Sequence, residues 1–462
     1  MRIERDSLGE MEVPDDAYYG VQTARAIRNF PISGLRAHPE WIRGVALIKI
    51  AAAKANQALG YLDPRRAGAI IEAASAVAEG KFNDHIVVDV FQAGAGTSFH
   101  MNLNEVIANR GCEILGSSKG DHKLLSPNDH VNMGQSTNDV IPTSMRLAAL
   151  PLASSVAREL RDLAGALDGK AREFDGILKS GRTHLQDAVP LRLGQEFGGY
   201  AAAVQKQAAL VAEAARPLEE LGIGGSAAGT GVNTHPDYRG LAVQFLSELT
   251  SLPLRASSNL FEAMQSMAPF TGLSGALRNL SGELIRIAND LRLLASGPNT
   301  GLNEIVLPAV QPGSSIMPGK VNPVMAEMLN MVCFQVIGND SCILVAAQAG
   351  QLELNVMMPV IAYNLLQSLT ILISGVRAFR EKCVSGISAN AEVCGRYADR
   401  TLALATVLNP YIGYLNAAEV AKESLRTGRS IKEIVKERKL LSDEQFAQVF
   451  DPAHLTEPRK IK

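Results

Sequence analysis

One part of the chain carries almost no charge, and no other feature restricts the fold as strongly. Residues 323–355 contain only three charged residues, Glu327, Asp340 and Glu353, and residues 356–376 contain none. A long helix with so little charge has no face suited to water. The chain must therefore bury this region, in either lipid or protein.

Polar amides within the same region decide between lipid and protein. They recur too often for a lipid-facing helix, at Asn330, Gln335, Asn339, Gln348 and Gln351. A helix of this length spans roughly 50 Å, which is more than one chain of this size readily surrounds. We therefore predict that subunits pack these helices together in an oligomer core. The alternative is a monomeric bundle with one deeply buried central helix.

The remainder of the chain also indicates helix. Aromatic residues make up only 5%, and alternation of apolar and polar residues at period two is hard to find. Long helices are predicted over 194–221, 257–296 (with a kink at Pro269), 323–355 and 359–386. The expected fold is all-α with three domains, an N-terminal domain (1–138), a central helical bundle (139–393) and a small C-terminal helical domain (394–462).

Charge and cysteine content exclude several classes of protein. Lys and Arg number 45 against 47 Asp and Glu, a net charge of −2, which gives no electrostatic basis for binding nucleic acid or an anionic membrane. The five cysteines form no C-x-x-C pair, which argues against a disulfide framework and a thiolate metal site. The beginning of the chain has no apolar signal-peptide segment. A cytoplasmic protein without a membrane span is expected.

Four polar, glycine-rich segments interrupt the helices, at 94–105, 132–139, 181–188 and 312–323. Each carries hydroxyls, amides or cations, which bind anions well beside helix termini. Ser, Thr, Asn and Gly are also what ordinary helix caps use, so caps are the alternative. A G-x-G-x-x-A pattern at 222–227 follows a helix rather than a strand, which disfavours a dinucleotide site. Neither a cofactor nor a metal ion is expected.

Taken together, these segments resemble the active-site regions of one enzyme family. The sequences are GTSFHMNLNEVIANR, PNDHVNMGQSTND, GRTHLQDAVPLRLGQEF and GSSIMPGKVNP. They are similar to the conserved regions of the aspartase/fumarase superfamily of lyases, and the resemblance covers nearly the whole chain. It implies three helical domains, a homotetramer whose core is built from the central helices, and active sites that are each shared by three subunits.

Particular residues resemble the aspartase branch, which eliminates ammonia from L-aspartate to give fumarate. Thr137 in QSTND and Leu185 in RTHLQD match aspartases, and Ser126 replaces a histidine of the second dicarboxylate site of fumarases. The departures from the aspartase pattern are His100 in place of Asn, Met358 in place of Glu, and the fumarase-like Gly134. The alternatives are a class II fumarase, which hydrates fumarate to malate, and an inactive structural relative.

The resemblance also implies a role for each site residue. Ser314 would be the general base, and His184 would pair with Glu327 across a subunit boundary. The aci-carboxylate formed by proton removal would accept hydrogen bonds from Thr97, Ser136, Thr137 and His184. The other substrate carboxylate would be held by Thr183, Lys320 and Asn322. Asn138, with Thr97 and Ser136, would orient the amino group.

Overall fold

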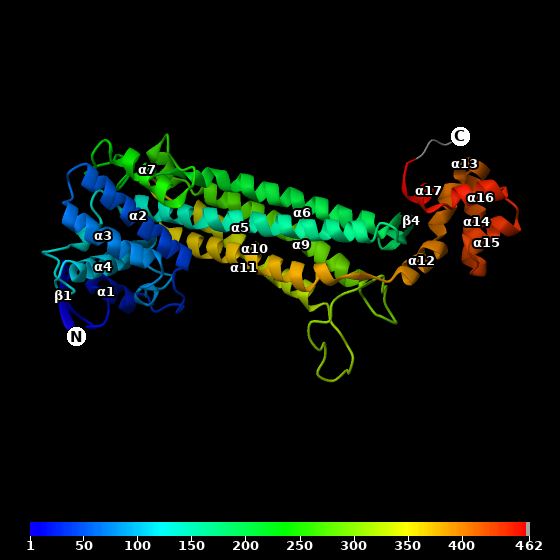
Figure 1. Cartoon of the computed structure of the whole chain (residues 1–462), viewed down its shortest axis with the longest axis horizontal. Helices are drawn as coiled ribbons and strands as arrows, with labels where there is room; N and C mark the ends of the chain where they lie inside the picture. Colours follow the sequence, from blue (N-terminus) through cyan, green and yellow to red (C-terminus); the bar gives the residue numbers. More distant parts are fainter. Residues whose placement is uncertain (459–462) are drawn as a thin grey trace. The chain divides into compact units, whose positions relative to one another are not determined.

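The computed structural model describes residues 1–458, which are mostly helical (Figure 1). The α-helices are α1 (Val21–Asn29), α2 (Pro39–Ala58), α3 (Pro64–Ala78), α4 (Thr97–Ile114), α5 (Thr137–Glu173), α6 (Leu193–Ala215), α7 (Tyr238–Thr250), α8 (Leu260–Gln265), α9 (Ala268–Leu294), α10 (Val324–Gln348), α11 (Met358–Lys382), α12 (Ala391–Arg400), α13 (Asn409–Ile412), α14 (Tyr414–Thr427), α15 (Ile431–Glu437), α16 (Asp443–Val449) and α17 (Pro452–Thr456). The predicted all-α class is confirmed.

Short two-stranded sheets accompany the helices in the described part of the chain. The strands are β1 (Arg2–Asp6), β2 (Gly9–Val13), β3 (Leu178–Thr183), β4 (Gln186–Arg192), β5 (Glu220–Leu221), β6 (Arg255–Ala256), β7 (Ile305–Val306) and β8 (Ser388–Ala389). β1–β2, β3–β4 and β7–β8 are antiparallel, and β5–β6 is parallel. None of these strands was predicted from the sequence.

The chain divides into two compact units, each assembled from three separate segments. Unit 1 comprises Met1–Ala157, Ala209–Ser281 and Cys333–Ile373. Unit 2 comprises Arg158–Ala208, Gly282–Val332 and the described chain from Ser374 onward. Several long helices, α5 among them, contribute residues to both units. The three domain boundaries drawn from the sequence remain a prediction.

In unit 1, α2 is the central helix of the N-terminal part, in contact with α3 and α7 (Figure 1). Trp41 is 1% exposed, and its indole nitrogen donates to Ser144 Oγ in α5 at 2.8 Å. A Cβ on Gly44 would lie 2.7 Å from the Ser144 carbonyl oxygen, so only glycine permits this approach of α2 to α5. The close packing places the first two turns of α2 beside the N-terminal part of α5.

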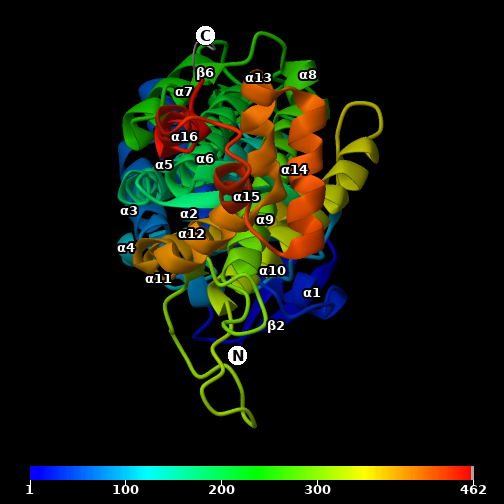
Figure 2. The ribbon, with the colours of Figure 1, turned by 90° about the vertical axis from the view of Figure 1, so that its right-hand side faces the viewer.

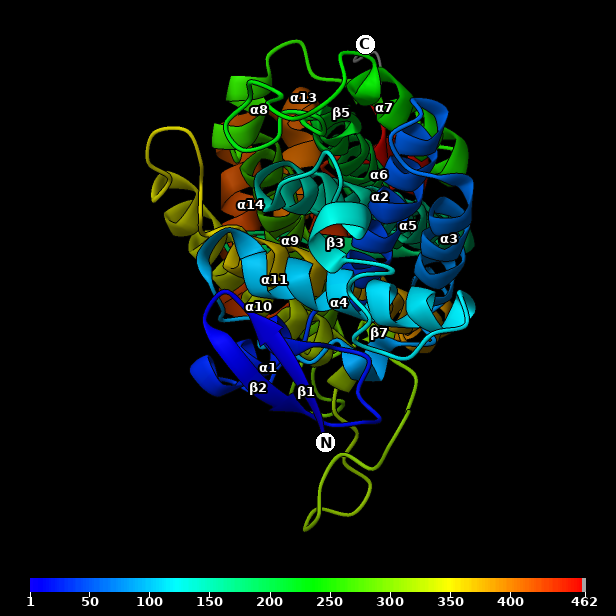
Figure 3. The same ribbon diagram turned by 90° about the vertical axis from the view of Figure 1, so that its left-hand side faces the viewer.

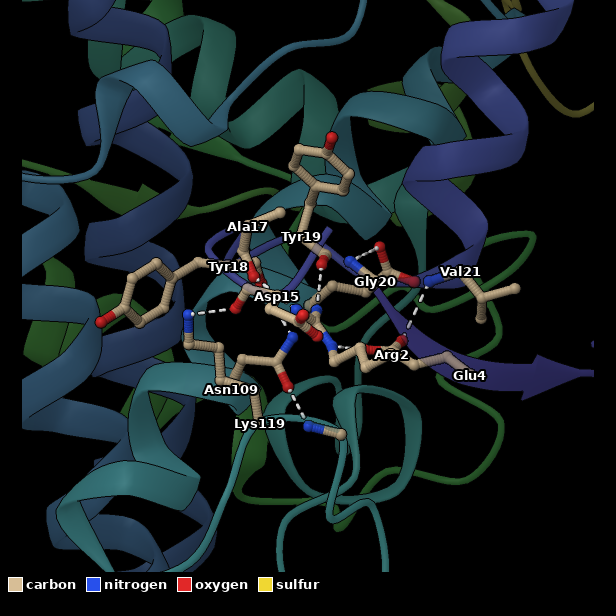
Figure 4. Close-up of polar contacts among 12 residues, drawn as sticks. Arg2, Glu4, Asp15, Ala17, Tyr18, Tyr19, Gly20, Val21, Asn109 and Lys119 are labelled. Carbon is tan, nitrogen blue, oxygen red and sulfur yellow. Dashed lines mark hydrogen bonds and ion pairs between the residues drawn. The ribbon is translucent and has the colours of Figure 1, made fainter. Parts of the chain in front are cut away.

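The N-terminal hairpin is held to the segment that follows it by one arginine (Figures 3 and 4). The Arg2 guanidinium donates to the carbonyl oxygens of Pro14, Ala17 and Tyr19 at 2.7, 2.8 and 2.6 Å. Glu4, the next inward-facing residue of β1, accepts from Val21 N at 3.0 Å. Because a guanidinium offers five donors in one plane, this one side chain holds three carbonyl groups of the turn before α1.

A buried carboxylate from α4 caps α1. Glu105 is 1% exposed and accepts from the backbone nitrogens of Gly20, Gln22 and Thr23 at 2.8, 2.8 and 3.1 Å, and from the Thr23 hydroxyl at 2.6 Å. Burial raises the pKa of Glu105, and the hydrogen bonds that it accepts oppose that rise. The first amides of a helix lack partners within it, so this side chain fixes α1 on α4.

Unit 2 contains the β3–β4 hairpin and the C-terminal helices, of which α14 and α15 are seen in orange and red in Figure 2. The apolar core of the C-terminal helices includes Leu408, Ile434 and Val449, each fully buried. Glu304, 0% exposed, anchors the hairpin, because it accepts from Arg182 at 2.9 Å and lies 3.0 Å from Lys179 Nζ. The end of β3 is therefore held rigidly.

The long helices differ in their limits from the sequence prediction. The predicted helix over 257–296 is two helices, because Asn259 caps α8 and Ser266 and Met267 separate it from α9. Pro269 is the second residue of α9 rather than a kink, since the first turn needs no donor from it. The helices predicted over 194–221, 323–355 and 359–386 end earlier, at Ala215, Gln348 and Lys382.

α10 has an apolar face that the chain does not cover. Phe334, Leu344 and Val345 are 57%, 55% and 60% exposed, and Gly338 and Ser341 lie between them on the same face. On the opposite side, buried Asn339 donates to Ser368 Oγ of α11 at 2.9 Å. By length and composition alone, α5, α10 and the segment Met358–Gly386 could each cross a membrane. These helices include the region that the sequence analysis assigns to an oligomer core.

Candidate active site

The two polar segments of unit 1 lie at the N-termini of α4 and α5. Thr97 is the first residue of α4, and it follows Ala95 and Gly96, whose φ angles are 61° and 83°. Thr137 is the first residue of α5, and Ser136 precedes it with its Oγ accepting from Asn138 N at 3.2 Å. Thr97 is exposed, and Ser136, Thr137 and Asn138 are half-buried. The predicted hydroxyl donors thus lie at helix N-termini, where a negative charge is favoured.

Asp139 connects the start of α5 to a glycine-rich loop. Its carboxylate accepts from Ser136 N at 2.9 Å, Gly224 N at 3.1 Å and Ser226 N at 3.0 Å. It is 0% exposed, and burial raises its pKa from 3.8 to about 6, against the lowering effect of these hydrogen bonds. Asn138 Nδ2 donates to Ala227 O of the same loop at 2.8 Å. No role for Asp139 or for this loop was predicted from the sequence.

A buried lysine and histidine lie directly behind Thr137. Lys49 Nζ of α2 lies 2.7 Å from His100 Nε2 of α4, and His100 Nδ1 lies 2.8 Å from Thr137 Oγ1. Lys49 and His100 are 0% and 1% exposed, and burial lowers the pKa of each well below its usual value. Lys49 was missed in the sequence analysis, although it is the only charged residue in the run GVALIKIAAA.

In unit 2, the segment 181–188 forms the tip of the β3–β4 hairpin. Thr183 ends β3 and pairs with Gln186, so His184 and Leu185 form a two-residue turn. Their φ angles are 56° and 60°, as a type I′ turn requires, and such turns normally carry Asn and Gly. Left-handed backbone costs roughly 1–2 kcal/mol for an ordinary residue. Strain of this kind is concentrated at functional sites, and here it presents an exposed imidazole.

The segment 312–323 of unit 2 is a loop that closes on itself before α10. Gly313 N donates to Lys320 O at 2.9 Å, and Asn322 Nδ2 donates to Gly313 O at 2.5 Å. A Cβ on Gly313 would lie 2.3 Å from the Lys320 carbonyl oxygen, so glycine is required there. Ser314 Oγ accepts from the backbone nitrogens of Ile316 and Met317 at 3.2 and 3.0 Å.

The predicted site residues are divided between the two compact units. Thr97, Ser136, Thr137 and Asn138 belong to unit 1, whereas Thr183, His184, Ser314, Lys320, Asn322 and Glu327 belong to unit 2. Glu327 lies in the first turn of α10 and is half-buried. Within residues 1–458, His184 and Glu327 form no ion pair, and no hydrogen bond joins the hairpin turn to the 313–322 loop. The assignment of these residues to one active site therefore remains a prediction, because the expected site is shared between subunits.

In the described part of the chain, neither the cysteines nor a cluster of metal-ligating side chains adds a catalytic group to the predicted site residues. All five cysteines are free, and burial raises the pKa of Cys112 to about 11 and that of Cys333, Cys383 and Cys394 to about 12. Such thiols are poor nucleophiles at neutral pH. In the described part of the chain, no three His, Cys, Asp or Glu side chains gather as a possible metal site.

Family models cover most of the chain. One described as Lyase matches residues 9–338, and one described as Fumarase C C-terminus matches residues 404–457. An aspartate ammonia-lyase of a Bacillus species is 47% identical over 458 residues, which is 99% of this chain and 98% of that protein. A class II fumarate hydratase of Halobacterium salinarum is 52% identical over 456 residues, 98% of this chain and 97% of that protein.

Solved structures of similar proteins also match nearly the whole chain. A fumarate lyase:delta crystallin from Brucella melitensis bound to cobalt has a TM-score of 0.96 at 47% identity, covering 99% of this chain and 100% of that one. A class II fumarase from Schistosoma mansoni has a TM-score of 0.93 at 38% identity, covering 98% of each chain. Both similarities extend over the full fold.

Proposed function

Because this chain belongs to the aspartase/fumarase superfamily of lyases, we propose that it eliminates ammonia from L-aspartate to give fumarate. The observation that carries this proposal is full-length similarity to aspartate ammonia-lyases, in a chain that keeps a serine, a lysine and an asparagine in the loop before α10. Thr137 and Leu185, which resemble the aspartase branch, support the choice of aspartate over malate. An inactive structural relative has no reason to keep the loop residues.

The reaction requires strong stabilisation of negative charge. A proton leaves the carbon beside one carboxylate, and that carboxylate becomes an aci-form dianion before ammonia departs from the adjacent carbon. Donors placed where such charge develops usually supply the largest part of the rate acceleration. In this proposal Thr97, Ser136, Thr137 and His184 donate to the dianion. The helix N-termini that carry the first three add a favourable dipole.

Ser314 is the proposed general base, and its surroundings suit that role. A serine hydroxyl is a weak base, so it must act as an oxyanion. The backbone nitrogens of Ile316 and Met317 already donate to Ser314 Oγ, and charge-assisted hydrogen bonds of this kind strengthen when the oxygen ionises. Lys320, in the same loop, neutralises the second substrate carboxylate, which Thr183 and Asn322 also hold.

His184 and Asn138 have proposed roles on either side of the reacting carbons. His184 is exposed at the hairpin tip, so it can reach a neighbouring subunit, where Glu327 would orient the imidazole and favour its protonated form. The Asn138 amide nitrogen is already engaged by Ala227 O. Its carbonyl oxygen is therefore the atom that can accept from the substrate's ammonium group, together with the hydroxyls of Thr97 and Ser136.

We propose that the chain works as a homotetramer. The exposed apolar face of α10, with Phe334, Leu344 and Val345, supports this because a face of that kind normally marks an interface. Shared active sites would also explain why the predicted residues fall into two groups. A reducing, cytoplasmic setting suits the five free thiols.

A class II fumarase is the second candidate function. It is favoured by the 52% identity to the halobacterial fumarate hydratase and by the fumarase-like Gly134. The chemistry would be the same except that water rather than ammonia departs. Ammonia and water are similar in size. The choice between aspartate and malate must therefore depend on polar contacts near Asn138.

Absorbance of fumarate formed by the purified protein tests the proposal directly. We expect kcat/KM for L-aspartate to exceed that for L-malate at least about a hundredfold. Sites built around specific hydrogen bonds can discriminate against analogues that lack them by a factor of about 10⁴ or more in kcat/KM. Equal or faster turnover of malate would contradict the proposed aspartate lyase activity and support the class II fumarase. Turnover of neither substrate would favour an inactive relative.

A further inference from the structure

A chain of buried side chains leads from α2 to the first residue of α5. It runs from Lys49 Nζ to His100 Nε2, and from His100 Nδ1 to Thr137 Oγ1, with separations of 2.7 and 2.8 Å. Lys49 and His100 are inaccessible to solvent, whereas Thr137 is half-buried. The proposed chemistry uses Thr137 but gives no role to the two residues behind it.

The hydrogen-bond partners of Lys49 match the donors of an ammonium in number. Nζ also lies 3.0 Å from Asn132 Oδ1 and 2.8 Å from Gln135 Oε1. The orientation of both amides is fixed, because Asn132 Nδ2 donates to Gln135 O, and Gln135 Nε2 donates to the carbonyl oxygens of Val131 and Met133. An ammonium has three donors. Here it meets three acceptors, namely the two amide oxygens and His100 Nε2.

The Asp139 carboxylate favours a charged Lys49, and burial opposes that charge. The Asp139 carboxylate is buried, accepts three backbone hydrogen bonds, and raises the pKa of Lys49 against the larger lowering effect of burial. A buried carboxylate is stabilised by a nearby cation. Burial and the Lys49 charge both lower the pKa of His100, so the imidazole is neutral, as an acceptor at Nε2 requires.

We propose that Lys49 and His100 are positioning residues that make the Thr137 hydroxyl a hydrogen-bond donor to the substrate. If Nε2 accepts from Lys49, the single proton of the neutral imidazole is on Nδ1, and Nδ1–H donates to Thr137 Oγ1. The hydroxyl oxygen then already has a donor, and its own hydrogen points elsewhere. This inference rests on the proposed function, in which a donor at Thr137 stabilises the aci-carboxylate.

An uncharged Lys49 would reverse every bond in this chain. The amine would accept from Nε2–H, Nδ1 would accept from the Thr137 hydroxyl, and Thr137 would offer only lone pairs to the substrate. Those lone pairs suit an ammonium group, not an oxyanion. The tautomer of His100 therefore distinguishes a threonine that serves the carboxylate from one that serves the leaving group.

The tautomer of His100 can be determined without any substrate by ¹⁵N NMR of the full-length protein labelled with ¹⁵N-histidine. The His100 signal is identified by its absence from His100→Gln. We expect a neutral ring protonated at Nδ1 near pH 7, and a change in the populations of the two tautomers in Lys49→Met. A ring protonated at Nε2, or an imidazolium, would overturn the proposal whether or not the protein acts on aspartate.

A double-mutant cycle tests whether His100 acts through Thr137. We expect His100→Phe and Thr137→Val each to lower kcat about a hundredfold, as loss of one oxyanion donor does, with a smaller effect on KM. The double variant should be no slower than Thr137→Val alone, and His100→Gln, which can both accept and donate, should recover part of the loss. Effects that multiply would contradict the proposal.

A second histidine–threonine pair in unit 1 provides the matched control. His38 Nε2 lies 2.9 Å from Thr370 Oγ1, away from the segments that carry the proposed site. His38→Phe should leave kcat near the wild-type value and combine multiplicatively with Thr137→Val. If the wild type turns over malate instead of aspartate, the same cycle is run with malate. In that case the proposed substrate fails while the role of Lys49 and His100 is still tested.

Discussion

At the scale of single residues, the proposed mechanism demands most of Ser314, which would have to be deprotonated to act as the general base. The two backbone nitrogens that donate to its oxygen are neutral, so the rest of the stabilisation must come from Lys320 and from the closed site. This division predicts different kinetic signatures for the two side chains. The Ser314 variant should lose chemistry alone, whereas the Lys320 variant should lose substrate binding and part of the chemistry.

Ser314→Ala should lower kcat by about three orders of magnitude or more while the protein stays folded and assembled, a size typical of losing a key catalytic group. Steady-state kinetics with circular dichroism and sedimentation checks this. Ser315→Ala is the matched control, because Ser315 is exposed and adjacent, and it should keep most of its activity. More than about a tenth of wild-type kcat in Ser314→Ala would remove Ser314 from the mechanism.

Lys320→Met should raise KM at least about a hundredfold, because the substrate carboxylate would be buried without its cation. Initial rates measured over a wide range of aspartate concentrations check this. Lys206→Met, at an exposed position of α6, changes the same charge away from the site and should have no effect. An unchanged KM in Lys320→Met would show that this lysine does not hold the substrate.

At the scale of elements, the loop before α10 depends on one close contact. Gly313→Ala should abolish most activity without unfolding the protein, since the added Cβ would lie 2.3 Å from the Lys320 carbonyl oxygen and displace both Ser314 and Lys320. Gly272→Ala, where nothing lies within 4 Å, is the control. Near-normal kcat/KM in Gly313→Ala would mean that the loop adopts another conformation during catalysis.

The helices could be predicted from the sequence, and the hairpins could not. Charge and propensity indicate α6, α10 and α11, and only their ends were misplaced. β3 reads LKSGRT, which has no alternating pattern, and its pairing with β4 is fixed by contacts distant in sequence, such as Arg182 with Glu304. A strand of this kind is defined by tertiary contacts rather than by its own residues.

The candidate site was predictable only as a set of motifs. Each polar segment is visible in the sequence, but the position of Lys49 behind Thr137 depends on how α2 packs against α4 and α5. A lone lysine in an apolar run could have pointed to a buried cation. Nothing in the sequence, however, identified its partners.

At the scale of the whole molecule, two strongly impaired variants should regain activity when they are mixed. Ser314→Ala disables the unit 2 group and Thr137→Val disables the unit 1 group. If different subunits supply these groups, random reassembly of an equal mixture regenerates roughly a quarter of the sites. Activity of the refolded mixture, compared with each variant refolded alone, measures this. No gain over the separate variants would place both groups in one subunit.

The uncovered face of α10 has a consequence for how the protein is made. If this face packs against another copy as proposed, a newly synthesised chain exposes Phe334, Leu344 and Val345 until the two copies meet. The same residues would attract any other incompletely folded chain. Productive pairing and aggregation then compete for one surface, and both accelerate with concentration. Recovery of active enzyme from denaturant should therefore pass through an optimum, limited by slow encounter in dilute solution and by precipitation in concentrated solution.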